Sequence, residues 1–528
     1  MGGRVMLPLL LCLSAAGAPL LVQGGDPYLF FTWNVTYGSI SPLGTPQQSI
    51  LINNQFPGPN INSTTTNNIV INVFNYLDEP FLLTWNGIQH RKNSWQDGVL
   101  ETNCPIPPKT NYIYRFQAAR GFGGLCINSR LLIPVPYDDP ADDYTILVGE
   151  WFSKGHIALK KILDSGRNLG RCDSVHINGK VAKGDGKDEP LFTLEPGKTY
   201  KYRICNVGIK TAFNIRFQGH NMRLVEMEGS HTMQSMYDSL DVHVGQCYSV
   251  LVTANQEPID YYVVASTEFT RQMVIATGII RYTNGKGVSS SKLPPPPTSW
   301  AWSLNQFRTF RWNLTASAVR PNPQGSYHYG SINITRTIKL INTAGKLNDK
   351  LRYAINGVSY VEPSTPLELT EYYNVADKVF NYDNIVDDPP TDISKITLDP
   401  IVLNLTYRDF IEIIFENHEN AIQSWHLSGY SFFAVAPKKR KNYYLLDVVS
   451  RHTIQVFPQS WAAILLTFDN CGMWNIRSEI WDRHYLGQQL YVSVLSSARS
   501  LKDEYNMPDD SLLCRIVESM PKPQPCNI

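Results

Sequence analysis

The sequence has 528 residues, which is long enough for roughly two to four domains. Hydrophobic residues make up 43% of it, while a net charge of +1 gives no electrostatic basis for binding nucleic acid or an anionic membrane surface. The 28 tyrosines and 11 tryptophans favour strands over helices. We therefore expect a folded, strand-rich protein with no nucleic-acid partner.

The N-terminus has the pattern of a secretory signal peptide. Arg4 precedes the apolar run 6–13, which leads into the small residues 14–18. We expect residues 1–24 to be removed, so that the mature chain starts near Asp26. This run is shorter than the about 18 apolar residues of a membrane span, and the C-terminus lacks the hydrophobic tail of a glycolipid-anchor signal. The sequence therefore predicts a secreted, extracellular protein without a membrane span.

Glycosylation and disulfide formation are expected in that compartment. Five N-x-S/T sequons are present, at Asn34, Asn62, Asn313, Asn333 and Asn404. One of the nine cysteines, Cys12, lies in the signal, and the others favour disulfides in an oxidising compartment. None of them forms a C-x-x-C pair, which argues against a thiol redox motif and a structural zinc site.

Strand-like runs recur along the chain and end in clusters of Asn, Asp, Gly or Pro. The clearest are residues 69–74, 144–148, 248–253, 261–265, 410–415, 463–467 and 490–494. They alternate or are wholly apolar, which is typical of antiparallel sandwiches. The clearest helical pattern covers residues 156–163 and is closed by Gly166.

A weak internal repeat predicts the number of domains. Strand, Asn-centred turn and strand follow one another at residues 49–58, 175–180 and 353–358. Residues 287–299 are too rich in Ser and Pro for a sheet and are interpreted as a linker. We predict three β-sandwich domains, at residues 26–137, 138–286 and 300–528.

Several motifs resemble those of one protein family in the same order along the chain. Residues 469–474, Asp-Asn-Cys-Gly-Met-Trp, resemble the D-N-x-G-x-W that leads into H-C-H-I-x-x-x-H-x-x-x-x-M in multicopper oxidases. Residues 56–59, 84–88 and 95–98 resemble F-P-G-P, H-W-H-G-I and W-x-D-G, and residues 424–430 resemble H-P-x-H-L-H-G-H. The resemblance implies an all-β fold of three cupredoxin-like Greek-key sandwich domains, with copper as the family cofactor.

A narrower resemblance points to a plant group within that family. Residues 26–31, 228–232, 237–243 and 423–427 resemble the Skewed-similar, or monocopper-oxidase-like, proteins, which include the pollen ascorbate-oxidase homologues. Relatives of that group are secreted glycoproteins linked to cell-wall expansion and pollen-tube growth. The resemblance implies a similar setting for this chain.

The residues that bind copper in the family motifs are replaced by others in this chain. A blue copper site needs a thiolate and two imidazoles with a weak axial ligand, and the positions implied for them hold Gln423, Ser478, Arg483 and Gln488. A serine hydroxyl supplies no soft thiolate, and an arginine has no lone pair to donate. The positions implied for the trinuclear cluster hold Thr84, Asn86, His426, Ser428, Arg477 and Glu479. We therefore expect no copper cofactor.

One ligand-bearing segment of the family has no counterpart. After residues 112–117 the family continues into a strand with a Y-H-x-H motif, whereas this chain passes directly to residues 118–124. We predict that the first domain lacks a strand and its turn, which would leave sheet edges exposed and weaken the domain. A skipped exon, an error in the gene model and true divergence would all produce this pattern.

Two alternatives stay open for the polar residues at these positions. His426 is either a hydrogen-bonded histidine in an inherited frame, which we favour, or a residual metal ligand, alone or with His418. Arg477, Glu479 and Arg483 form either an ion-pair strut between the first and third domains, which we favour, or a small anion pocket. His90 and His484 are interpreted as ordinary polar positions.

The resemblance also implies a disulfide between Cys104 and a cysteine near the C-terminus, for which we choose Cys514 over Cys526. Cys205 and Cys247 lie in one repeat and are candidates to pair, while the other pairings stay open. Our functional expectation is a secreted glycoprotein without enzymatic activity that binds a cell-wall polymer or a surface partner. The alternatives are an L-ascorbate-oxidase-like oxidoreductase that retains one copper, and a truncation product without function. The ligand and the oligomeric state are left open.

Overall fold

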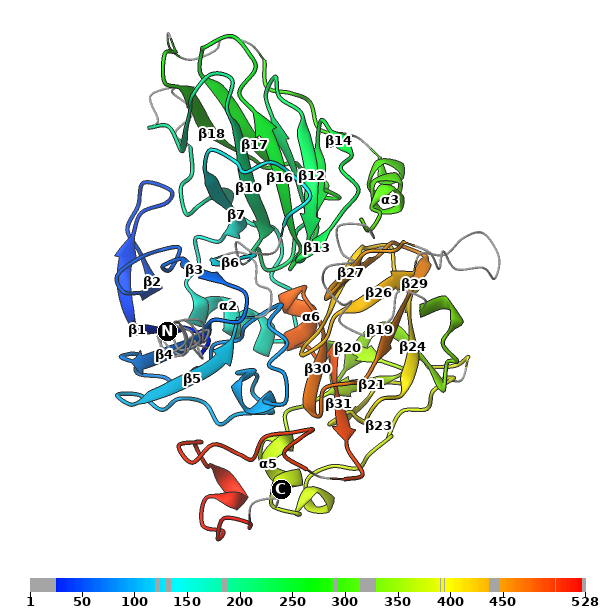
Figure 1. The fold of residues 1–528 in the computed structure, drawn as a ribbon. Coiled ribbons are helices and arrows are strands. Elements are labelled where there is room, and N and C mark those ends of the chain that lie inside the picture. Colours follow the sequence, from blue (N-terminus) through cyan, green and yellow to red (C-terminus); the bar gives the residue numbers. More distant parts are fainter. Residues whose placement is uncertain are drawn as a thin grey trace, which may run out of the picture.

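A computed structural model gives the fold of the chain. It describes residues 25–118, 124–129, 134–182, 189–285, 287, 292–297, 299–313, 329–389, 391–393, 395–435, 447–498 and 500–524. The predicted signal peptide, Cys526 and residues 288–291 and 298 of the predicted linker lie outside these residues. The fold is all-β, as predicted, and its strands form three sandwich-like units in chain order (Figure 1).

The first unit contains a four-stranded sheet of order β2-β1-β4-β5 and a two-stranded sheet of β3 and β6. Its elements are β1 (Tyr28–Ile40), β2 (Gln47–Ile52), β3 (Ile61–Thr64), β4 (Asn68–Asn75), η1 (Ser94–Gln96), β5 (Asn111–Gln117) and β6 (Leu125–Asn128).

The second unit pairs a larger sheet of order β13-β12-β16-β10-β7-β8, with β14 on β12, with a sheet of order β15-β11-β17-β18-β9. Its elements are β7 (Asp143–Trp151), α2 (His156–Asp164), β8 (Ser174–Ile177), β9 (Phe192–Leu194), β10 (Thr199–Asn206), β11 (Phe213–Phe217), β12 (Met222–Met227), β13 (Ser230–His231), β14 (Met236–Tyr237), β15 (Leu240–Val242), β16 (Cys247–Thr253), β17 (Tyr261–Thr267) and β18 (Ile275–Tyr282). Helix α2 lies where the sequence predicts it.

Helix α3 (Trp300–Thr309) follows the second unit and packs against it, since Gln306 hydrogen-bonds to the backbone of Asp241 in β15. The third unit has a sheet of order β22-β21-β20-β19-β24-β29-β26-β27 and a sheet of order β23-β31-β30-β25-β28. Its elements, with those of the C-terminal segment (residues 500–524), are η2 (Tyr329–Ser331), β19 (Arg336–Leu347), β20 (Lys350–Ile355), β21 (Val358–Tyr360), α5 (Leu367–Tyr372), η3 (Ala376–Lys378), β22 (Thr397–Asp399), β23 (Val402–Thr406), β24 (Phe410–Asn417), β25 (Gln423–Leu427), β26 (Phe432–Val435), β27 (Ser450–Arg451), β28 (Thr453–Val456), β29 (Ser460–Thr467), β30 (Gly472–Ser478), α6 (Trp481–Tyr485), β31 (Gln489–Leu495) and η4 (Arg515–Val517).

The three units share one topology. In each, the first strand pairs in parallel with a later strand of the same sheet, as β1 with β4, β7 with β10 and β19 with β24. The predicted Asn-centred turns also correspond, because Asn53, Asn178 and Asn356 all have φ near +50°. Each of these side chains accepts a backbone N–H from the first strand of its unit and donates to a carbonyl of that strand. The sequence repeat is therefore a structural repeat.

The first unit departs from this topology at one place. The second sheets of the other two units contain β17 and β30, which are formed by residues within the connections 254–274 and 468–488. The corresponding connection in the first unit, between β5 and β6, has only residues 118–124, and among the described residues no strand pairs with β6 except β3. In the part of the first unit that the structure describes, this strand is missing, as the sequence predicts.

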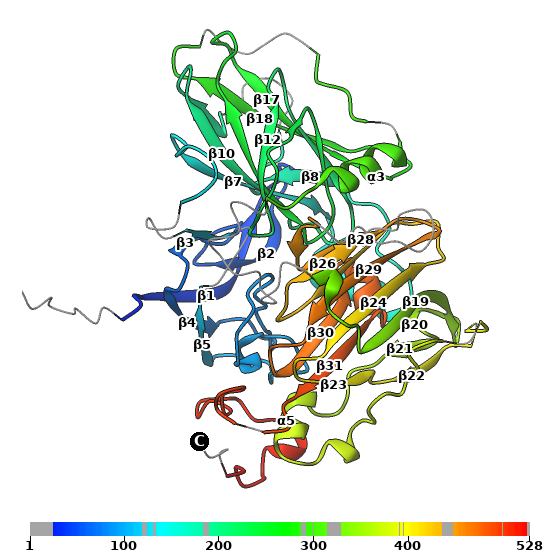
Figure 2. The ribbon, with the colours of Figure 1, turned by 45° about the vertical axis from the view of Figure 1, so that its right-hand side comes forward.

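The C-terminal segment returns from the third unit to the first (Figure 2). Cys514 in this segment is joined to Cys104 by a disulfide, the pairing that the sequence resemblance implies. Met507 and Val517 pack in a small apolar cluster with Trp95 of the first unit and Leu369 of α5. A second disulfide links Cys205 to Cys247 across β10 and β16, while Cys172 and Cys471 are buried thiols. No helix among the described residues is long and apolar enough to cross a bilayer.

Candidate functional site

Arg477, at the end of β30, is the centre of a polar cluster between the first and third units. Its Nη2 donates to the Asn86 side chain at 2.7 Å and lies 3.2 Å from a Glu479 carboxylate oxygen. Its Nη1 donates to the Ser428 hydroxyl and the Asn475 side chain, both at 3.3 Å. Because both terminal nitrogens have protein partners, the geometry favours the strut over an anion pocket.

Two carboxyl groups face this guanidinium. Asp97, from the first unit, is buried, and burial raises its pKa to about 6 against the opposing effect of Arg477 and a hydrogen bond with Ser428. Burial also raises the pKa of Glu479, again opposed by Arg477. The positive charge of Arg477 therefore stabilises the ionised form of one carboxyl group from each unit.

Arg483 does not join this cluster, contrary to our expectation. Its two terminal nitrogens donate to the two oxygens of Glu419, at 3.0 and 2.5 Å, and its guanidinium lies 4.5 Å from the Tyr353 ring centroid. The bidentate carboxylate and the aromatic face suit a planar guanidinium, which turns it away from Arg477. Arg483 therefore stabilises the third unit rather than the contact between units.

The remaining residues implied for the mononuclear site are buried and bound to their own unit. The Gln423 side chain donates to Asn417 and accepts from the Trp425 indole N–H. The Ser478 hydroxyl accepts from the backbone of Ile480, and Gln488 is fully buried. None of these side chains offers a soft donor.

His426 lies beside a second buried histidine, His452, which the sequence analysis did not identify. Their rings are 5.2 Å apart and nearly perpendicular. Burial lowers the pKa of His452 to about 3 and that of His426 well below its usual value, and Arg477 adds to both effects. Glu228, from the second unit, accepts the backbone N–H groups of His452 and Thr453, and burial raises its pKa to about 8. Both rings are therefore neutral at ordinary pH. His418, by contrast, is exposed and pairs with Glu416.

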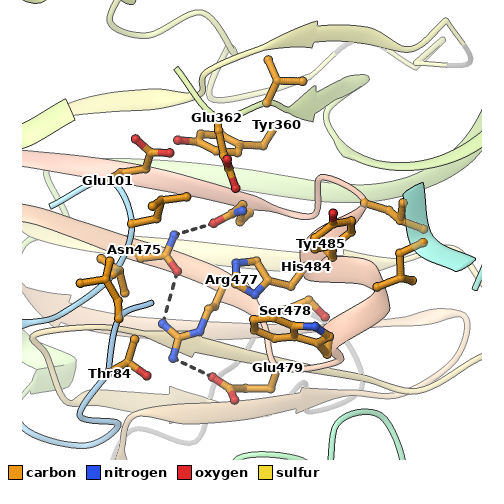
Figure 3. Close-up of a pocket in the computed structure, with 18 of the residues that line it drawn as sticks. Thr84, Glu101, Tyr360, Glu362, Asn475, Arg477, Ser478, Glu479, His484 and Tyr485 are labelled. Atoms are coloured by element: carbon orange, nitrogen blue, oxygen red, sulfur yellow. Dashed lines mark hydrogen bonds and ion pairs between the residues drawn. The ribbon is translucent and has the colours of Figure 1, made fainter. Parts of the chain in front are cut away.

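A pocket of about 790 Å³ opens next to the Arg477 cluster, where all three units meet (Figure 3). Arg477 and Glu479 lie at one end of it, while Glu101, Tyr360 and Glu362 lie at the other. Its wall also contains the aromatic rings of Phe81, Trp481 and Tyr485, the side-chain amides of Asn475 and Gln489 and the hydroxyl of Thr84. Size and lining are those of a pocket for an organic ligand that offers several hydrogen-bonding groups.

The predicted sequons differ in exposure. Asn34, Asn62, Asn333 and Asn404 are exposed, and Asn313 is half-buried. The exposed side chains are accessible to a modifying enzyme, and glycosylation remains a prediction at all five.

Comparison with known proteins identifies the family. Models of the multicopper oxidase family match residues 34–125, 142–285 and 364–500. This chain belongs to the multicopper oxidase family. It is 65% identical to the L-ascorbate oxidase homolog of Brassica napus over 96% of both chains, and 45% identical to the monocopper oxidase-like protein SKU5 of Arabidopsis thaliana over 94% of this chain and 91% of the relative.

A solved multicopper oxidase shares the fold. The structure of Fet3p, a multicopper oxidase that functions in iron import, aligns with a TM-score of 0.72 at 17% identity, over 88% of this chain and 90% of the other. The alignment with the Brassica napus relative extends over 535 positions, but 96% of this chain is only about 507 residues. About 28 positions of that alignment therefore have no counterpart in this chain.

The residues of this chain do not fit the family cofactor. The guanidinium of Arg477 and the hydroxyls of Ser428 and Ser478 stand where multicopper oxidases need imidazoles and a thiolate. Among the described residues, no group of three or more His, Cys, Asp and Glu side chains is arranged to hold a metal ion.

Proposed function

We propose that this chain is a secreted, non-catalytic member of the multicopper oxidase family, which binds a polymer or partner at the plant cell wall or surface. The observation that carries the proposal is the arrangement around Arg477. A permanent positive charge occupies a position implied for copper binding, and it is already satisfied by Asn86, Ser428 and Glu479. The names of the relatives include "homolog" and "monocopper oxidase-like", which is consistent with activity that differs within the family.

Metal content and oxygen consumption test the absence of catalysis. The chain is expressed as a secreted protein, supplied with copper, dialysed and examined by elemental analysis and visible spectroscopy. Oxygen uptake is then measured with ascorbate and with a phenol, and an L-ascorbate oxidase purified in the same way is the positive control. We expect neither stoichiometric copper nor oxygen uptake above buffer. A blue protein that consumes oxygen would overturn the proposal.

One observation favours a second function, an oxidoreductase with a single residual copper. His426 and His452 are two neutral imidazoles side by side, and neutral imidazole is a good copper ligand. If this reading is right, the wild type takes up about one copper per chain with a nitrogen-coupled paramagnetic signal, and His426→Ala and His452→Ala lose it. Loss of copper only in His418→Ala would point to adventitious surface binding.

The pocket supports the binding part of the proposal. Exposed aromatic rings stack on the apolar faces of sugar rings, and amide and carboxyl groups hydrogen-bond to their hydroxyls. Trp481, with 48% of its surface exposed, contributes such a ring to the pocket. We expect depletion from solution by insoluble wall polysaccharides to fall about tenfold in Trp481→Ala, which corresponds to 1.4 kcal/mol.

The matched control for this assay is Trp300→Ala, which removes a 39% exposed tryptophan of α3 outside the pocket. Equal loss in both variants, or none in Trp481→Ala, would remove the pocket from the proposal. Retention of a soluble surface protein instead of a polysaccharide would replace the polymer by a protein partner.

A further inference from the structure

The three units contain the same strand-turn segment, which locates the incomplete sheet of the first unit. Gly87, Gly219 and Gly429 all have positive φ, of 85°, 73° and 75°. Each follows a segment of the second sheet, which is β11 in the second unit and β25 in the third. Residues 81–86 are therefore the counterpart of β11 and β25.

In the complete units a strand lies directly beside this segment. β17 pairs antiparallel with both β11 and β18, and β30 pairs antiparallel with both β25 and β31. The counterpart of β18 and β31 is β6, because each of these three strands pairs in parallel with a short strand of its own unit. Between residues 81–86 and β6, none of the described residues forms the corresponding strand, and we call this place the vacant position.

A cavity marks this position in the structure. It has a volume of about 430 Å³, and both borders of the vacant position line it, with Leu83–Asn86 on one side and Gly124 and Leu125 on the other. Trp33, Ile61 and Leu147 make its wall apolar in part, whereas Asn206, His452 and Glu479 make the rest polar. The missing strand thus leaves space as well as a gap in the sheet.

Part of the backbone of β6 is directed into this position. The N–H groups of Ile61 and Thr65 bond to the carbonyls of Gly124 and Asn128, so even-numbered residues of β6 face β3. In a parallel ladder the residues between them turn their N–H and C=O groups to the opposite edge. Leu125 and Ile127 therefore present backbone groups to the position that a strand occupies in the other units.

We propose that this edge binds an extended peptide segment of another polypeptide, which completes the sheet by β-strand addition. An exposed edge with an apolar wall behind it is the usual receptor for this mode of binding. The occupant is antiparallel to β6, with alternate residues apolar toward Trp33 and polar toward Glu479. The second and third units show what fills the position, since β17 and β30 are each a single strand antiparallel to the counterpart of β6. The proposal does not depend on metal content, so it can fail while the proposed function stands.

The chain itself supplies the probe. A labelled peptide with the sequence of residues 472–479, Gly-Met-Trp-Asn-Ile-Arg-Ser-Glu, reproduces the strand of the third unit. We expect saturable binding to the secreted protein by fluorescence anisotropy and a raised unfolding temperature. At ten times the measured Kd, exchange is expected to slow about elevenfold at the amides of Leu125 and Ile127, which face the position, and at amides within Leu83–Asn86.

Two controls test the mode of binding. The same peptide with Pro in place of Ile476 lacks one backbone N–H donor and is expected not to bind. A peptide of the same composition in scrambled order is also expected not to bind. A chain in which residues 254–274 replace residues 118–124 carries its own strand and is expected not to bind either. If that variant does not fold, the mode of binding is still tested by comparing the original peptide with the Pro-substituted peptide and by the amide-exchange measurement. Equal binding of the Pro peptide, protection elsewhere in the chain, or no binding at all would overturn the proposal.

Discussion

At the scale of single residues, Arg477 is notable because it connects two units through buried polar contacts. Asn86 and Asp97 belong to the first unit, while Ser428 and Glu479 belong to the third. An ion pair with little exposure is costly to break from one side only, because the remaining charge stays buried without a partner. Arg477 is therefore expected to matter more for stability than an ion pair at the surface.

Replacing Arg477 by Met tests this. We expect Arg477→Met to lower the free energy of unfolding by about 3 kcal/mol, because it leaves Glu479 buried without its cation. Glu479→Gln in the same chain is expected to restore part of the loss, measured as the coupling energy of a double-mutant cycle in urea. Arg91→Met, which removes the more exposed pair with Asp469, is the control and is expected to cost under about 1 kcal/mol. Equal losses in both arginine variants would contradict a special role for Arg477.

The sequence alone predicts which residues occupy the ligand positions, but not what they bind. Ser478 and Arg477 lie inside a long motif, so their positions follow from the motif itself. Their partners are set by contacts that are far apart in the chain, such as Arg477 with Asn86 and Arg483 with Glu419. His452 belongs to no motif, and only the pairing of β28 with β25 places it beside His426.

At the scale of elements, the Asn-centred turns combine two roles in one residue. Asn178 has φ of +51°, which Asn tolerates better than most residues, and its side chain makes two hydrogen bonds to β7. These bonds fix the turn after β8 against the first strand of the unit. The same arrangement at Asn53 and Asn356 explains why the repeat is visible in the sequence.

Asn178→Ala is expected to lower the free energy of unfolding by about 2–3 kcal/mol, since it removes both hydrogen bonds and adds backbone strain. Asn178→Gly relieves the strain but not the lost bonds, so its stability is expected to lie between the other two. Thermal and urea unfolding measure the series. If the Gly variant is no more stable than the Ala variant, the strain argument is wrong.

The strands and helix α2 were predictable from the sequence, whereas the other helices were not. The seven predicted runs all lie in strands, because alternation and buried apolar runs are local signals. Helix α3 follows the Ser/Pro linker and contains few strong helix formers, so its pattern gave no prediction. The missing strand was predictable only from the family resemblance, because this chain passes directly from residues 112–117 to 118–124 where the family continues into a strand.

At the scale of the whole molecule, the Cys104–Cys514 disulfide closes a loop that contains most of the chain. Its sequence separation is 410, against 42 for Cys205–Cys247. The chain-entropy model gives about 6 kcal/mol for the long loop and about 4 kcal/mol for the short one, as upper values. We expect Cys104→Ser with Cys514→Ser to destabilise the protein more than Cys205→Ser with Cys247→Ser in urea unfolding. The reverse order would show that local strain outweighs loop closure.

The pH dependence of stability is set by two opposed sets of buried groups. Burial lowers the pKa of His90, His243 and His452 from 6.5 to about 3, so the unfolded state binds more protons between those values. Stability is therefore lost as the pH falls from 6.5 to 3. Burial raises the pKa of Glu228 and Glu268 from 4.5 to about 8, so the folded state binds more protons there. Stability is therefore lost as the pH rises from 4.5 to 8.

The maximum of the free energy of unfolding is therefore expected between pH 4.5 and 6.5. In this interval the effects of the buried histidines and of the buried glutamates on the pH dependence oppose each other. Glu228→Gln removes a titrating group without removing the acceptor for the backbone of His452. Its free energy of unfolding is therefore expected to fall less steeply than that of the wild type between pH 6.5 and 8, with the acid side unchanged. Urea unfolding from pH 3 to 9 measures both profiles, with the exposed Glu518→Gln as control. If the free energy of unfolding falls equally steeply in the wild type and in Glu228→Gln between pH 6.5 and 8, the pKa of Glu228 is not raised in the folded protein.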